Sequence, residues 1–281
     1  MALGTVAQMW RYPVKSMQGE GLESAEVSER GIAGDRAYAL IDTATGKIAS
    51  AKNPRKWPGL LRWSAVFSEA PAAGGIPPVR VTFPDGTSLA SGDPGFDERA
   101  SAILGRGVTL SAVPVESQVL EEYWPDIDGL AHRETVTDEA ISAGTPSRSF
   151  FDFSAIHLVT RSTLAALSRA YPDGRFEPYR FRPNLLISDA PEGFPENQWV
   201  GRQIRIGADV VLEILIPCPR CVMTTLPQRD LPLDSGILGT AARQNTVMIA
   251  PFGVAMPSVG VYAKVVHGGG VRAGDAVALV D

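Results

Sequence analysis

The two cysteines of the chain, Cys218 and Cys221, stand three positions apart in the run IPCPRCVMTT. A Cys-x-x-Cys pair can provide half of a zinc site, a thiol redox pair, or one thiolate ligand for a softer metal centre. A structural zinc ion takes four ligands, and the histidines, His132, His157 and His267, do not stand at the spacing of a zinc finger. The histidine spacing therefore argues against zinc.

Two other interpretations of the cysteine pair stay open. A thioredoxin-type pair should begin a helix, whereas residues 222–225 read as a β-branched run that continues a strand. The second alternative is a pair of buried structural thiols in a barrel strand. Arg220 stands between the cysteines, and a guanidinium beside a thiol favours the thiolate form that binds metals. We therefore favour a metal-ligating thiolate.

A second cluster with chemical potential lies in RYPVKSMQG and GDRAYAL, near the start of the chain. Lys15, Ser16 and Arg36 offer a cation, a hydroxyl and a bidentate fork, which together suit a phosphate group. The alternative is that these residues are solvated surface turns. A third candidate is Arg182 in FRPN, where the following proline fixes the chain at the start of a strand. Its alternative is a surface arginine.

The composition is that of a folded globular chain. Of the 281 residues, 44% are hydrophobic and 20% are charged, so the chain can bury the cores of two domains. A net charge of -5 argues against a nucleic-acid polymer as partner. No run approaches the roughly 18 apolar residues of a membrane span, and the start does not resemble a signal peptide. Two cysteines in one motif fit a reducing compartment, so we expect a cytoplasmic protein.

The elements that must position these residues are mostly short strands separated by turn residues. Such runs occupy 6–12, 22–27, 36–42, 61–67, 79–83, 156–159, 185–188, 203–206, 210–216, 247–250, 259–266 and 276–280. Helices are expected at 97–104 and 160–170, while 113–147 is acidic and poorly periodic. This pattern favours a barrel over a doubly wound sheet. We expect a mainly β fold with some helix, divided into domains 1–112 and 113–281.

Several motifs, in this order along nearly the whole chain, resemble the MOSC superfamily. They are YPVKS, GDR, DFSAIHLVT, RFRPN, CPRCVMTT and GVYAKVVHGGGVRAGD. The resemblance is to the two-domain branch, which includes the mitochondrial amidoxime reducing component and bacterial N-hydroxylated-base reductases. It implies an N-terminal β-barrel-like domain followed by a C-terminal MOSC β-barrel.

The resemblance also implies roles for individual residues. The metal-ligating cysteine of the family follows an arginine directly, which gives the ligand role to Cys221 and leaves Cys218 as a neighbour. Lys15, Ser16 and Arg36 would hold the phosphate of a molybdenum cofactor, a molybdopterin. The residues expected to line the rest of the cofactor are Asp152, Phe153, Ser154, Arg182, Pro219, Arg220 and Tyr262. Phe153 and Pro219 replace polar residues of better-known relatives, so only their backbone groups carry over.

The function implied by the resemblance is reduction of a small N-oxygenated compound at molybdenum, with Asp152 orienting water or relaying a proton. Electrons would come from a separate ferredoxin-type or flavin-type donor protein, because the four clustered cysteines of a ferredoxin are not present. A carrier of the cofactor, or of activated sulfur on Cys221, is the alternative. A β-barrel interaction module without metal is a third. We expect a monomer.

Overall fold

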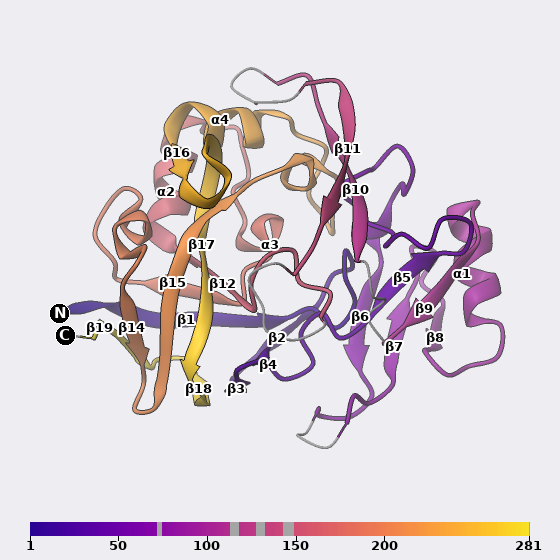
Figure 1. Ribbon diagram of the computed structural model, residues 1–281, viewed down its shortest axis with the longest axis horizontal. Helices are drawn as coiled ribbons and strands as arrows, with labels where there is room; N and C mark the ends of the chain where they lie inside the picture. Colours follow the sequence, from indigo (N-terminus) through magenta and orange to yellow (C-terminus); the bar gives the residue numbers. More distant parts are fainter. Residues whose placement is uncertain (72–74, 113–117, 128–132, 143–148, 281) are drawn as a thin grey trace.

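The computed structural model describes residues 1–71, 75–112, 118–127, 133–142 and 149–280. Strands predominate over helices, which confirms the expected mainly β fold (Figure 1). The strands are β1 (Ala2–Arg11), β2 (Glu20–Leu22), β3 (Ser24–Ser28), β4 (Gly31–Ile32), β5 (Ala39–Asp42), β6 (Ser64–Phe67), β7 (Val79–Thr82), β8 (Ser88–Ala90), β9 (Val108–Ser111), β10 (Val119–Trp124), β11 (Thr135–Ala140), β12 (Ile156–Thr160), β13 (Leu185–Ser188), β14 (Gln203–Ile206), β15 (Val210–Pro219), β16 (Thr246–Ile249), β17 (Val254–His267), β18 (Gly269–Arg272) and β19 (Ala276–Leu279). The α-helices are α1 (Phe96–Leu104), α2 (Arg161–Ala170), α3 (Pro178–Phe181) and α4 (Gly236–Gln244). The 3-10 helices are η1 (Leu60–Arg62), η2 (Pro195–Trp199), η3 (Val222–Thr225) and η4 (Ala250–Phe252).

A closed barrel of seven strands is the main body of the molecule. Its strands follow one another in the order β12, β13, β1, β19, β14, β15 and β17, and β17 pairs back with β12. In β14, Ile204 and Ile206 are buried while Arg205 between them is exposed, which is the period-2 alternation of a strand with one face in a core. The barrel core gathers aliphatic side chains from every one of these strands.

Strand β1 joins the two ends of the sequence within this barrel. It pairs antiparallel with β13 on one side and with β19 on the other, so the first residues close a sheet built from the last half of the chain. The division at residue 112 stays a prediction, and hydrogen bonds of the barrel cross it. β1 then runs from the barrel toward the small N-terminal sheets (Figure 1).

The N-terminal part packs small sheets around its own apolar core. β5 pairs with β9, and β6, β7 and β8 form a three-stranded sheet. Trp63 packs edge-on against Phe83 with ring centroids 4.8 Å apart, and Phe96 of α1 lies against Phe83. The segment after β1 is tied to this part by bridges from Val14 to Tyr38 and from Gln18 to Ser64. The residues between β1 and these bridges therefore lie at the seam between the two parts.

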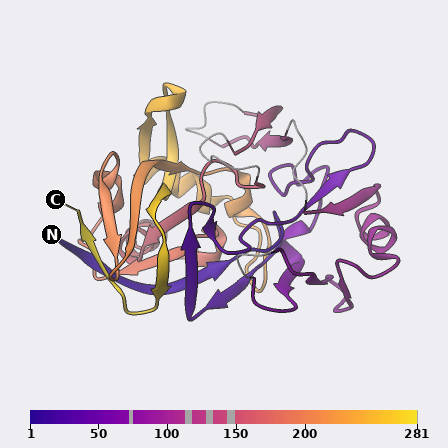
Figure 2. The same ribbon diagram turned by 60° about the horizontal axis from the view of Figure 1, so that its bottom comes forward.

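Two regions differ from the sequence expectation. The region taken as poorly periodic contains the antiparallel hairpin of β10 and β11, which stands beside the barrel in a second view (Figure 2). Residues 222–225 form the 3-10 helix η3 and do not continue a strand, because β15 ends at Pro219. The argument that no helix follows the cysteine pair is therefore wrong. Within the described ranges, no helix has the length and apolar character needed to span a membrane.

Candidate functional site

Lys15 and Asp152, 137 positions apart in the sequence, form a partly buried ion pair at the seam. The Lys15 Nζ donates to Asp152 Oδ1 at 2.7 Å and to the Phe150 carbonyl at 2.9 Å. Ser16 is buried too, and its Oγ accepts a hydrogen bond from the Ala51 backbone amide at 3.1 Å. The structure thus brings together the N-terminal motif and the start of the barrel.

Two guanidinium groups lie against the ring of Tyr12. The carbon at the centre of the Arg36 guanidinium is 4.4 Å from the ring centroid, and that of Arg182 is 4.2 Å from it. Arg36 donates to Asp35 at 2.5 Å and to the Arg182 carbonyl at 3.2 Å. Arg182 donates to the Met17 carbonyl at 2.6 Å. The predicted phosphate residue Arg36 and the predicted pterin residue Arg182 therefore share one site.

The backbone of this site is strained at three of the predicted positions. Ser16, Arg36 and Arg182 have φ angles of 64°, 48° and 54°, in the left-handed region that residues with a side chain rarely adopt. Such strain costs free energy and is concentrated at binding and catalytic sites. Three of the seven non-glycine residues that have a left-handed backbone in the described ranges are thus predicted site residues.

Cys221 is a half-buried free thiol directly before η3, and Cys218 is a fully buried free thiol in β15. Burial, with the nearby Glu122 as a further cause, raises the pKa of Cys221 to about 12, against the smaller opposing effects of Lys52 and Arg220. Without a bound cation this side chain is therefore a neutral thiol. A metal that binds here must displace its proton.

Arg220 contacts the other cysteine. Its Nη1 donates to Cys218 Sγ at 2.8 Å and its Nη2 to the Phe181 carbonyl at 3.0 Å. The sequence argument placed this guanidinium beside the metal-ligating thiol. The structure shows the hydrogen bond going to Cys218, because β15 ends between the two cysteines and directs their side chains differently.

Asp152 is held in its ionised form by the cations around it. Burial raises the pKa of Asp152, but the attraction of Lys15 and Lys52 outweighs it and sets the pKa well below its ordinary value. The Lys52 Nζ is 3.7 Å from Asp152 Oδ1 and 3.0 Å from Glu122 Oε2. Asp152 is therefore an ionised hydrogen-bond acceptor at physiological pH, and its lowered pKa makes it a weak base.

The sequence reasoning missed Lys52, Glu122 and Tyr12 as site residues. Tyr12 is the first residue of the quoted YPVKS motif, so its position was a usable signal. Glu122 lies on β10, in the region taken as poorly periodic, and Lys52 lies in a turn with no motif around it. Only the fold brings these two side chains to the site.

The charge balance of the site calls for an anion. Lys15, Lys52 and Arg36 each have a carboxylate partner. Arg182 and Arg220 are buried, and within the described part of the chain no carboxylate pairs with either. Burial of an unpaired charge is costly unless a counter-charge is supplied.

Unused hydrogen-bond donors point to the same kind of ligand. The hydroxyl of Tyr12 and the Nε of Arg220 are buried and have no hydrogen-bond partner among the residues the structure describes. Burial raises the pKa of Tyr12 to about 12, so its hydroxyl keeps its proton. A ligand rich in anionic oxygen would use these donors and neutralise the two arginines. The residues present therefore fit a phosphate-bearing cofactor held beside a cysteine.

The other predicted lining residues lie around the same seam. The Ser154 Oγ donates to the Ala263 carbonyl at 2.8 Å, so its hydroxyl serves the barrel. Tyr262 of β17 is opposite His157 of β12, and its ring is 5.7 Å from that of Phe153. Pro219 is the last residue of β15. These residues thus come from different elements: Ser154 precedes β12, Pro219 ends β15 and Tyr262 lies on β17.

A zinc site is not supported in the described ranges. No three His, Cys, Asp or Glu side chains gather there as a metal-binding set. His157 is buried within β12 and His267 is exposed at the end of β17; His132 lies outside the described residues.

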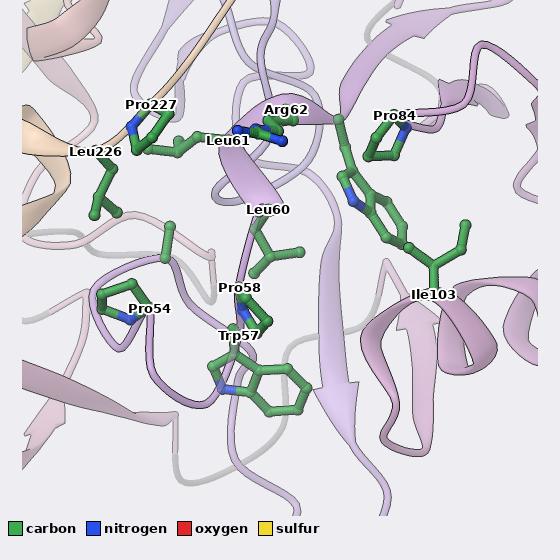
Figure 3. A pocket seen from close by; sticks show the side chains of 13 residues that line it. Pro54, Trp57, Pro58, Leu60, Leu61, Arg62, Pro84, Ile103, Leu226 and Pro227 are labelled. Carbon is green, nitrogen blue, oxygen red and sulfur yellow. The ribbon is translucent and has the colours of Figure 1, made fainter. Parts of the chain in front are cut away.

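A separate apolar pocket of about 450 Å³ opens in the N-terminal part (Figure 3). Its walls include Trp57, Leu60, Pro84 and Ile103, with Leu226 contributed by the C-terminal part. None of the predicted site residues lines this pocket. It is therefore distinct from the cationic site.

The fold and the candidate site define a class of protein: a closed β-barrel with an N-terminal β-rich part, and a cluster of buried cations beside one cysteine at their seam. The model of the MOSC N-terminal beta barrel domain matches residues 3–87, and that of the MOSC domain matches residues 145–278. Together the two matches cover most of the chain, which belongs to the MOSC family. The recognition made from the sequence motifs is confirmed.

The chain is also similar to named proteins and to solved structures. The chain is 25% identical to mitochondrial amidoxime reducing component 2 of Rattus norvegicus over 98% of this chain and 83% of that one. It is 25% identical to mitochondrial amidoxime-reducing component 1 of Mus musculus over 99% and 83%. Among solved structures, the YUAD protein from Bacillus subtilis is 13% identical with a TM-score of 0.46, over 98% of this chain and 93% of that one.

Proposed function

We propose that this protein is a molybdenum-cofactor-binding oxidoreductase that reduces small N-oxygenated compounds with electrons from a separate donor protein. The observation that carries the proposal is a pair of buried arginines, Arg182 and Arg220, that have no carboxylate partner among the described residues and lie beside a free cysteine at the seam. The distant similarity to amidoxime reducing components supports the reaction class.

The cofactor would be held by this chain from two sides. Arg36, Arg182 and Tyr12 offer donors for its phosphate, together with Lys15 on the same segment. Cys221 would supply the thiolate ligand. When bound, the cofactor supplies a redox-active metal with a position open to the substrate.

In the reaction that we propose, the N–O bond of the substrate breaks. Two electrons and two protons convert the N-hydroxyl group into an N–H group and water. Asp152 stays ionised and would orient the substrate or the departing water through hydrogen bonds. Lys15 and Lys52 hold the Asp152 carboxylate in place. Through these two lysines, the carboxylate that would contact the substrate is linked to the cations that would hold the cofactor.

The test uses protein from a host that makes the cofactor. We expect close to one equivalent of molybdenum per chain, and reduction of benzamidoxime when reduced viologen replaces the donor protein. Cys221→Ser should abolish the reduction while circular dichroism stays unchanged, whereas Cys218→Ser should keep much of it. The rates of all variants are compared with their molybdenum content.

Three outcomes would contradict the proposal. Zinc in place of molybdenum would do so, and so would equal losses in both cysteine variants, which would favour disulfide exchange. Metal-loaded protein that reduces no N-oxygenated compound, yet passes cofactor or sulfur to an apo-enzyme, would instead identify a carrier.

A further inference from the structure

Three aromatic rings, those of Phe252, Phe153 and Tyr262, contact one another in succession. Phe252 lies in η4, at the tip of the β16–β17 hairpin, and its residue is 50% exposed. Its ring meets that of Phe153 edge-on, at 6.0 Å and 89°. The Phe153 ring is in turn 5.7 Å from that of Tyr262, tilted by 38°. The hairpin projects from the barrel (Figure 2).

One end of this series is at the candidate cofactor site. Phe153 directly follows Asp152, whose side chain is 35% exposed and paired with Lys15. Burial raises the pKa of Tyr262 well above its ordinary value, with the nearby Cys218 and Asp152 as further causes. The Asp152 carboxylate therefore lies near Tyr262, the ring that Phe153 contacts.

Core packing does not account for these rings. The four apolar cores of the described chain contain neither Phe153 nor Phe252 nor Tyr262. Phe153 is half-buried and Phe252 is exposed, so apolar ring surface faces solvent next to a cluster of charges. Offset and edge-on ring pairs are favourable beyond the area that they bury, and a planar ligand can extend such a row.

We propose that Phe153 and Phe252 form an aromatic wall that selects N-hydroxylated substrates carrying a flat aromatic ring. The ring stacks on the wall, and the polar N-hydroxyl end lies toward Asp152 and Cys221. This inference rests on the proposed function and adds a substrate class to it. Small aliphatic N-hydroxyl compounds gain nothing from the wall.

The experiment compares benzamidoxime with acetamidoxime, which carries the same reacting group without the ring. Rates are measured with reduced viologen at equal molybdenum content. We expect Phe252→Ala to raise the KM for benzamidoxime about threefold to tenfold, in line with the strength of a ring pair. The kcat for benzamidoxime and both constants for acetamidoxime should change less than about twofold. Phe153→Leu should raise the KM for benzamidoxime in the same direction.

Met248→Ala is the matched control, because Met248 is 60% exposed on the same hairpin and outside the row of rings. It should leave both KM values unchanged. Direct titration of benzamidine, the reaction product, should show the same loss of affinity in Phe252→Ala as the kinetics, without requiring turnover.

Some outcomes would contradict the aromatic wall alone, and others would contradict the reductase function as well. Equal effects of Phe252→Ala on the two amidoximes would overturn the wall while leaving the reductase intact. An effect that appears only with a protein electron donor, and not with viologen, would also overturn it. Molybdenum-loaded wild-type protein that reduces neither compound would overturn the proposed function, and the wall with it.

Discussion

Tyr12 is the residue whose environment is least explained by the folded chain itself. Its hydroxyl is buried, lacks a partner among the described residues, and lies on a ring flanked by Arg36 and Arg182. An unsatisfied buried hydroxyl costs about 1–3 kcal/mol. A phenylalanine ring would make the same contacts with the two guanidinium groups. We therefore expect the hydroxyl to form a hydrogen bond with a bound ligand.

Tyr12→Phe tests this use. We expect the variant to retain several-fold less molybdenum after dialysis, because one donor to the cofactor is lost. The apo-protein should be as stable as wild type or more stable, since the orphan hydroxyl is gone. Metal analysis and thermal unfolding measure the two effects. The control is Tyr38→Phe, whose hydroxyl donates to the Pro77 carbonyl; equal molybdenum loss in both variants would contradict the assignment.

His157 should make the fold sensitive to acid. Burial lowers the pKa of His157 to about 3, so the folded chain holds it neutral. An unfolded histidine has a pKa of about 6.5. Between these values the unfolded chain binds the extra proton, so the stabilisation present above pH 6.5 is lost as the pH falls toward 3.

Urea unfolding at pH 7 and pH 5 measures this dependence. His157 should account for a loss of about 2 kcal/mol over that interval. His157→Gln, which cannot titrate, should therefore lose about that much less than wild type. An identical loss in the two proteins would assign the acid sensitivity to other groups.

At the scale of elements, β17 needs one glycine, Gly260, to lie close enough to β12 to pair with it. Gly260 has a φ of 79°, and a Cβ there would strike the Leu158 carbonyl and crowd the His157 ring. β17 also carries Tyr262, so the close pairing of β17 with β12 fixes the position of this predicted site residue. The strand can follow its path only without a side chain at that point.

Gly260→Ala should lower the free energy of unfolding by about 3 kcal/mol or more, from the backbone strain and the clash together. Gly201→Ala is the control, because Gly201 has a φ of 78° and open space around its Cβ position. It should cost only the strain, about 1 kcal/mol. Denaturant titration measures the free energy of unfolding of both variants. Equal losses of this free energy would mean that β17 and β12 have room for a side chain at Gly260.

The same elements show what the sequence could predict. The run 203–206 alternates polar and apolar residues, and the run 185–188 is apolar up to Ser188; they match β14 and β13. η3 was missed because its β-branched residues favour a strand locally, and only the end of β15 at Pro219 turns the chain. Arg182 and Lys15 could be proposed from motifs, whereas Glu122 reaches the site through a long-range fold that no local pattern encodes.

For the whole molecule, the placement of β1 determines what can fold alone. A fragment of residues 113–281 lacks the strand between β13 and β19, which leaves two unpaired edges and an open barrel. We expect this fragment not to unfold cooperatively. Appending residues 1–11 after its last residue through a short turn should restore cooperative thermal unfolding, because β1 and β19 are antiparallel neighbours.

A version of the appended strand with Leu3→Asp and Val6→Asp is the control. Both side chains are buried in the barrel core, so charges there should prevent closure. Thermal melts followed by circular dichroism distinguish the fragments. Cooperative folding of the bare fragment would show that the barrel closes without β1, which would support a structural boundary near residue 112.

The position of β1 also sets how the barrel responds to traction. Leu279 donates its amide to the Met1 carbonyl at 2.9 Å, so the outer ends of β1 and β19 lie side by side. The two strands are antiparallel, so a pull that separates these ends breaks the hydrogen bonds between β1 and β19 one after another. The force is not shared over all of these hydrogen bonds at once. We therefore expect a pull on the two ends of the barrel to separate β1 from β19 before the other strand pairs.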